Sequence, residues 1–186
     1  MHRNLTTKVF MGLTYHYRFT APASASSARL EKFLKCVETD ARRLGFSPTM
    51  VLNAEFDSPE RQDFARRLTS GQFIENKELQ GVVVFRDGQV WDHDSAHGNC
   101  RVIPERAVVL VITDEQHCET ILGFFQYPKT LKDLNGRDVI DIAAASTWIF
   151  EDFVKTPDAR LRQLVKKFAE AGYVELEEDE FADARK

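Results

Sequence analysis

Alternating apolar and polar side chains predict two strands in the first third of the chain. Apolar residues occupy every second position over 13–20 and again over 49–56, and a period of two is typical of a half-buried strand. Between them, the apolar residues from Leu30 to Leu44 follow helical spacing, and Gly45 is suited to end that helix. We therefore expect a strand, a helix and a second strand, in this order.

Helix-boundary signals define the start of the first helix and place two more helices. Ser26 or Ser27 can cap the first helix, because a hydroxyl oxygen accepts hydrogen bonds from the free N–H groups of a first turn. Pro59, which follows a serine, opens a short second helix. Near the C-terminus, Thr156 followed by a proline opens a third helix, and Gly172 ends it.

Turn signals predict antiparallel hairpins in the middle of the chain. Asp87-Gly88 and Asn135-Gly136 are dipeptides that suit tight turns, and the polar residues 114–117 separate two long apolar runs. The strand pairs expected at Asp87-Gly88 and at 114–117 are 82–85 with 89–91 and 107–113 with 120–127, and 139–142 and 148–153 are expected as strands flanking the turn at Asn135-Gly136. The three alanines at 143–145 are equally typical of a helix.

Together these elements indicate an α+β fold. We expect a two-layer, mixed or antiparallel sheet with helices packed on one face, in which a β-α-β-α start is followed by β-hairpins and a C-terminal helix. A short edge strand is expected at 173–176. Residues 11–178 are expected to form a single α+β domain, with a disordered extension over 1–10 and an acidic tail over 179–186.

Composition and charge change this picture only by excluding classes of partner. The chain has 186 residues, and its 25 Lys and Arg against 29 Asp and Glu give a net charge of −4 at pH 7, so we expect no nucleic-acid partner. No apolar run approaches the length of a membrane span, and we expect no membrane association. Three cysteines are too few for a disulfide framework and favour a reducing, cytoplasmic location.

Metal-binding residue types are densest in the segment 92–100, which we expect to be a loop. Imidazole, thiolate and carboxylate groups are the ligands that zinc prefers. The candidate zinc ligands are His93, His97 and Cys100, with Asp92 and Asp94 beside them and His117 or Cys118 as a fourth ligand. The sequence favours the alternative of a solvent-facing turn, because Asp, His, Ser, Gly and Asn also satisfy the backbone of turns.

A second candidate site follows from the alternation in the two early strands. If 13–20 and 49–56 are neighbouring strands, the face opposite the helices carries His16, Arg18, Asn53 and Glu55. An Arg–Glu pair beside a titratable His is suited to bind a carboxylate or phosphate, or to perform acid–base chemistry. The alternative is a solvated sheet face with one cross-strand ion pair, and the sequence favours that alternative.

Common catalytic motifs are absent from the sequence, which contains no Gly-x-Ser-x-Gly, Gly-x-Gly-x-x-Gly or Walker loop. We therefore expect a non-catalytic protein that binds a partner or a small ligand, and we assign no catalytic residues. The expected partners are a second copy of the chain, in a homodimer, or a small anionic ligand. The alternative function is a metal-assisted hydrolase that uses zinc in the Asp92–Cys100 segment.

Overall fold

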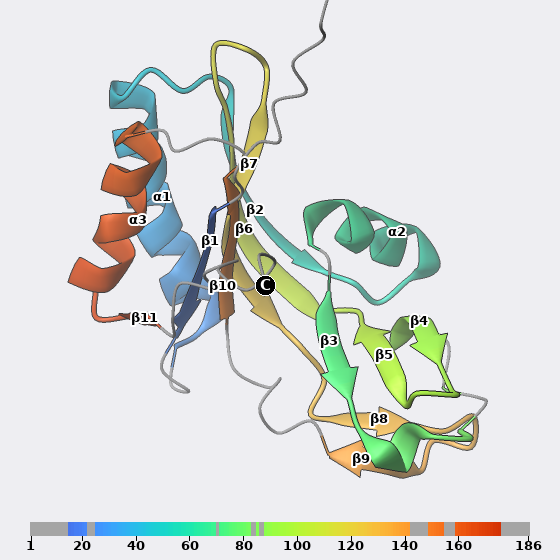
Figure 1. The fold of residues 1–186 in the computed structure, drawn as a ribbon. Coiled ribbons are helices and arrows are strands. Elements are labelled where there is room, and N and C mark those ends of the chain that lie inside the picture. The colour runs from blue at the N-terminus through green and yellow to red at the C-terminus, as the bar shows by residue number, and fades with distance from the viewer. Residues whose placement is uncertain are drawn as a thin grey trace, which may run out of the picture.

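The fold of the protein, in a computed structural model, is α+β, and its described residues form one large antiparallel sheet, two small sheets and three α-helices (Figure 1). The structure describes residues 15–21, 25–69, 71–82, 85, 88–141, 149–154 and 159–175. The sequence-based prediction of an α+β fold is confirmed. The predicted extension over 1–10 and the predicted tail over 179–186 lie outside the described residues.

Six strands form the large sheet, and every neighbouring pair in it is antiparallel. In chain order they are β1 (Tyr15–Thr20), β2 (Thr49–Glu55), β6 (Arg106–Thr113), β7 (Glu119–Gln126), β10 (Ile149–Val154) and β11 (Val174–Glu175). Their order across the sheet is β11-β1-β10-β7-β6-β2. Strand β2 therefore forms one edge of this sheet, and the expected short edge strand after the last helix forms the other.

The early strands are not neighbours, although the sequence suggested that they could be. Strands β10, β7 and β6 lie between β1 and β2. The chain leaves β1, passes through helix α1 (Ser27–Arg43) and crosses over these positions before it enters β2. The hairpin β6–β7 lies beside β2, and its two long apolar strands pair with each other along their full length, as the sequence predicted.

Two small sheets complete the strand structure. Strands β3 (Gln72–Glu75), β5 (Asn99–Val102) and β4 (Val90–Asp94) form a three-stranded sheet in this spatial order. Strands β8 (Thr130–Lys132) and β9 (Asp138–Asp141) pair across the turn at Asn135-Gly136. A 3-10 turn, η1 (Lys77–Leu79), lies between β3 and β4.

The predicted hairpin at Asp87-Gly88 falls largely outside the described residues. Of the described residues in it, Val82 and Phe85 are not in a strand, and β4 pairs with β5, which follows it. The residues Val83, Val84, Arg86 and Asp87 lie outside the described residues. The segment 92–100, expected to be a loop, is consequently two strands joined by a turn at 95–98.

The prediction that all helices pack on one face of the sheet is also wrong. Helices α1 and α3 (Ala159–Glu170) share one face, where they form a core with Val108, Leu110 and Phe124 of the sheet. Helix α2 (Pro59–Leu68) packs on the opposite face with the small sheets (Figure 1). Successive side chains along β6 and β7 point to opposite faces of the sheet, so these strands supply side chains to both cores.

Helix ends agree with the local sequence signals. The Ser26 Oγ accepts a hydrogen bond from the Arg29 N–H at 3.3 Å and caps α1. At its other end Gly45 has φ +91°, and the Phe46 N–H donates to the Ala41 carbonyl at 3.1 Å, which completes a Schellman cap. The predicted N-cap of the last helix, Thr156, lies outside the described residues.

Candidate functional site

The predicted metal ligands lie on a β-hairpin that separates them. Asp92, His93 and Asp94 belong to β4, and Cys100 on β5 is the cross-strand neighbour of His93. His97 lies in the connecting turn, where its Nδ1 is 2.6 Å from Asp94 Oδ2. This hydrogen bond lowers the pKa of the Asp94 carboxyl and orients the imidazole along the turn.

The two candidates that do face each other are poorly placed as ligands. Cys100 is only 2% exposed, and burial raises the pKa of its thiol to about 11, which disfavours the thiolate that zinc requires. The His93 ring packs edge-on against Phe85 with centroids 4.9 Å apart. The Nε2 atom of His93 is buried and has no hydrogen-bond partner among the described residues.

His117 and Cys118 lie at the β6–β7 turn, far from the β4–β5 hairpin (Figure 1). That turn is closed locally, because Asp114 Oδ1 accepts hydrogen bonds from the N–H groups of Gln116 and Cys118. Among the described residues no three His, Cys, Asp or Glu side chains are grouped as a metal ion would need. The structure therefore does not bring the expected zinc ligands together.

The second candidate set is divided between distant strands. His16 and Arg18 lie on β1, and Asn53 and Glu55 lie on β2, four strand positions away. With neighbouring strands about 4.8 Å apart, the separation is roughly 19 Å. The side chains of His16 and Arg18 lie outside the described residues. The expectation that the four residues meet is wrong, because its premise of adjacent strands is not met.

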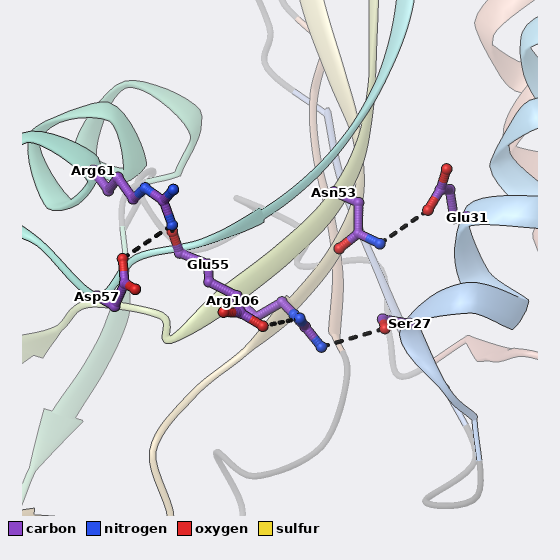
Figure 2. A network of polar contacts seen from close by, with 7 residues as sticks. All are labelled: Ser27, Glu31, Asn53, Glu55, Asp57, Arg61 and Arg106. Carbon is purple, nitrogen blue, oxygen red and sulfur yellow. Dashed lines mark hydrogen bonds and ion pairs between the residues drawn. The ribbon is translucent and has the colours of Figure 1, made fainter.

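Glu55 has a different arginine as its partner. The antiparallel register places Arg106, the first residue of β6, directly opposite Glu55, the last residue of β2. Arg106 Nη2 forms an ion pair with the Glu55 carboxylate, and its Nη1 donates to Ser27 Oγ at 3.3 Å (Figure 2). The Nε atom of Arg106 is buried and has no hydrogen-bond partner among the described residues.

These side chains border a cleft at the end of β2 and the start of β6. The cleft consists of two adjoining cavities of about 460 and 650 Å³ that share Glu55, Phe56 and Arg106. Its remaining lining residues are Glu31, Asn53, Ala54, Asp57, Arg61, Gln62, Phe64, Gly88, Gln89, Ile103, Pro104, Glu105, Gln126 and Pro128. Its walls therefore come from α1, α2, β2, β6, β7 and the segments that adjoin them.

Backbone hydrogen bonds fix the centre of the cleft. The Phe56 N–H donates to the Glu105 carbonyl at 2.9 Å, and the Glu105 N–H donates to the Gln126 carbonyl at 2.8 Å. Helix α2 begins immediately afterwards, capped by Ser58, which accepts from the Arg61 N–H at 3.4 Å. Because α2 starts soon after β2 ends, Asp57 before the helix and Arg61 in its first turn both lie at the rim of the cleft.

A second arginine and an amide extend the polar network along the rim (Figure 2). Arg61 Nη1 donates to Asp57 Oδ1 at 3.0 Å and to the Glu55 carbonyl at 3.5 Å. Asn53 Nδ2 donates to Glu31 Oε2 at 2.9 Å. Hydrogen bonds from Lys35 and Asn53 lower the pKa of the Glu31 carboxyl, which therefore stays ionised at neutral pH.

The lining is rich in charged and amide side chains. It contains four carboxylates and two guanidinium groups, together with amide groups from Asn53, Gln62, Gln89 and Gln126. The described lining includes no Ser, Thr, Cys, His, Lys or Tyr, and so no common nucleophile other than a carboxylate. Arg106 was missed by the sequence analysis, and its one local signal is a charge that opens a long apolar run after Pro104-Glu105.

None of the helices within the described ranges is both long enough and apolar enough to cross a lipid bilayer. Comparisons of the chain with protein-family models, with curated proteins and with solved structures find no match.

Proposed function

We propose that the protein is a non-catalytic binding protein and that its ligand is a small anionic molecule held in the cleft around Arg106. The observation that carries this proposal is the guanidinium group of Arg106. It borders both cavities of the cleft, and its Nε–H is a buried donor without a partner among the described residues. A carboxylate or phosphate is the group that such a fork of donors recognises best.

The ion pairs already present do not prevent this binding. The side chains of Glu55 and Asp57, which pair with Arg106 and Arg61, are 54% and 66% exposed. Ion pairs with this much exposure to solvent contribute little free energy, so an incoming anion can replace a carboxylate at small cost. Arg106 and Arg61 can then both donate to the ligand.

The acidic excess of the lining narrows the class of ligand further. Glu31, which already accepts from Lys35 and Asn53, and Glu105 add two more carboxylates to the lining. Both would repel a simple dianion, whereas a ligand that also carries hydroxyl, amide or ammonium donors can donate to Glu105. The ligand class that fits is a small polar molecule with one carboxylate or phosphate and several hydrogen-bond donors.

The same lining argues against catalysis. A carboxyl group acts as a general acid at neutral pH when burial keeps it protonated. Glu55, Asp57 and Glu105 are all exposed. Because the described lining also has no imidazole, thiol or hydroxyl group, the proposal is a binding role rather than a reaction.

The test adds small hydroxy acids, amino acids and sugar phosphates to the isotope-labelled protein. Binding is measured from the changes in its backbone amide NMR shifts. The expected shifts centre on Glu55, Phe56 and Arg106. Arg106→Gln keeps most of the volume of the side chain and removes its charge. It should weaken binding by about tenfold or more, since hydrogen bonds to a charged group contribute about 1.5–3 kcal/mol.

Two control arginines make this test specific. Arg43→Gln removes an exposed guanidinium outside the cleft, where Arg43 pairs with Asp40 at 3.4 Å, and it should leave affinity unchanged. Arg18→Gln should also have no effect, because β1 lies far from the cleft. Binding that survives in Arg106→Gln, or that is lost in Arg18→Gln, contradicts the proposed site.

A further inference from the structure

Among the described strands, β2 has a neighbour on only one side of its backbone. Two hydrogen bonds flank its pairing with β6: Thr113 N–H to the Pro48 carbonyl at 3.1 Å, and Phe56 N–H to the Glu105 carbonyl at 2.9 Å. Because an antiparallel ladder bonds alternate residues, the even-numbered positions of β2 face β6 and the odd-numbered positions face outward. The N–H and C=O groups of Val51 and Asn53 therefore point to the free edge.

The two ends of this edge are already covered by arginine side chains. Arg42 Nη2 donates to the Thr49 carbonyl at 2.9 Å, and Arg61 Nη1 donates to the Glu55 carbonyl at 3.5 Å. Both acceptors are odd-numbered, which agrees with the alternation. The open part of the edge is thus short and centred on Val51.

A row of alternating charges on α1 follows the same edge. Glu31, Lys35, Glu38 and Arg42 are spaced so that they share one side of the helix. Asn53 donates to Glu31, and Thr49 Oγ1 donates to Glu38 Oε1 at 3.0 Å, so this side of α1 faces β2. We call these four residues the charge row.

The charge row is complementary to itself when it is reversed. In an antiparallel arrangement with a second copy, Glu31 meets Arg42 of that copy, and Lys35 meets Glu38. All four contacts are then between opposite charges. The row contacts β2 at Asn53 through Glu31 and at Thr49 through Glu38 and Arg42, so Val51, on which the open backbone edge is centred, lies between the two points of contact.

A two-fold axis at Val51 also gives partners to the outward-facing backbone groups of β2 and to the side chains on the opposite face of the sheet. Val51 then pairs with Val51 of the second copy, and Thr49 pairs with Asn53, through outward-facing groups of both chains. On the other face, Met50, which is 51% exposed, lies opposite Leu52 of the second copy. Because α1 contacts both β2 and β6, the two α1 helices come to roughly 10 Å from each other, a normal packing distance.

We infer that the protein forms a homodimer in which β2 of two copies pair antiparallel about Val51 and join the two large sheets into one. The backbone N–H of Asn53 in the second copy replaces Arg42 as the donor to the Thr49 carbonyl. The released Arg42 then binds Glu31 of the second copy. The dimer contacts share Glu31 and Asn53 with the rim of the proposed cleft, but they do not include Glu55 or Arg106. Arg106→Gln should therefore leave the mass in solution unchanged.

Charge exchange gives the sharpest test, read by analytical ultracentrifugation across the micromolar range. The wild-type chain should sediment as a dimer. Arg42→Glu places two acidic groups opposite each other, Glu31→Arg places two basic groups opposite each other, and each variant alone should dimerise at least about tenfold more weakly. An equimolar mixture of the two variants should regain the dimer, because every contact in the mixed pair is again between opposite charges.

The backbone contribution has its own test. Val51→Pro removes an N–H that faces outward, so pairing with β6 is retained while the hydrogen bonds at the two-fold axis are lost. It should give a folded monomer by circular dichroism and ultracentrifugation. Val51→Thr keeps the N–H and should dimerise like the wild-type chain.

Lys32→Glu changes net charge as much as Arg42→Glu does and lies outside the charge row, so it should not affect dimerisation. A wild-type chain that remains monomeric at millimolar concentration overturns the inference. So does a dimer that both Arg42→Glu and Val51→Pro leave intact, or a mixture of the two charge variants that does not associate.

Discussion

At the scale of single residues, burial and partners separate side chains that look alike in the sequence. Cys36 and Cys118 are exposed, whereas Cys100 is buried within the second core. Similarly, Glu55 was identified as a candidate from strand alternation, but its partner is Arg106 and not Arg18. Local patterns give the face of a strand; they do not give the strand that lies beside it.

The burial of Cys100 predicts a difference in thiol reactivity. In the folded protein at mildly alkaline pH, iodoacetamide should modify Cys36 and Cys118 and leave Cys100 unmodified, because the thiolate is the reactive form. Mass spectrometry of the labelled peptides measures this directly. Equal labelling of all three thiols without denaturant contradicts the buried position.

The same raised pKa predicts a dependence of stability on pH. The unfolded thiol loses its proton at about pH 8.5, and the folded thiol does so only at about 11. Below the first value the protonation of Cys100 has no effect on stability; above it the unfolded state releases a proton that the folded state retains, so stability falls with rising pH. In urea titrations, Cys100→Ala should lose less stability than the wild-type chain as pH rises from neutral toward 10.

At the scale of elements, the sequence predicted best where the structure is decided locally. The cap at Ser26, the Gly45 stop and the β6–β7 hairpin all depend on residues close in the chain. The pairing of β4 with β5 was not predicted, because the segment 92–100 was expected to be a loop and its turn is stabilised by tertiary packing. Gly98 is buried, and a Cβ there would lie 2.5 Å from the Asn76 carbonyl oxygen, so the β4–β5 turn depends on a close approach of η1.

The β6–β7 pair contains a similar close approach at its centre. A Cβ on Gly123 would lie 2.5 Å from Val109 Cα and 2.6 Å from the Val108 carbonyl oxygen. Gly123→Ala should therefore lower the free energy of unfolding by about 1–3 kcal/mol, because backbone atoms cannot move aside freely. Urea denaturation measures the change.

A matched glycine separates this clash from conformational strain. At Gly136, where φ is +78°, an added methyl group meets nothing within 4 Å, so Gly136→Ala should cost only the roughly 1–2 kcal/mol of the left-handed backbone. It should also leave the slope of the urea transition unchanged. A neutral Gly123→Ala variant contradicts the packing of β6 against β7.

At the scale of the whole molecule, strand order was beyond reach of the sequence. The connection through α1 joins strands that are four positions apart, and periodicity carries no information about where a long connection returns. The cleft depends on the same long-range order, because it forms only where the register of β2 and β6 brings Glu55 opposite Arg106. Its residues are consequently found from the assembled fold and not from any motif.

The sharing of β6 and β7 between the two cores predicts a single unfolding transition. Phe124 belongs to the core under α1 and α3, while Phe125 belongs to the core under α2 and the small sheets. Neither core can open without disrupting these strands. In a Trp148→Phe variant, where Trp91 is the remaining tryptophan and packs against the second core, fluorescence and far-UV circular dichroism should give the same urea midpoint. Two separate midpoints contradict shared strands.

The short open edge of β2 also determines how far self-association can proceed. A long exposed strand is a template for aggregation, since each added chain presents a new edge to the next. In the dimer that we infer, a two-fold contact uses up the β2 edge of both chains, and the opposite edge of the large sheet, among the described strands, is β11, which has two residues. So short a strand is a poor template for further pairing. The joined sheet is thus closed at two chains, and concentrated solutions of the wild-type protein should resist fibre growth.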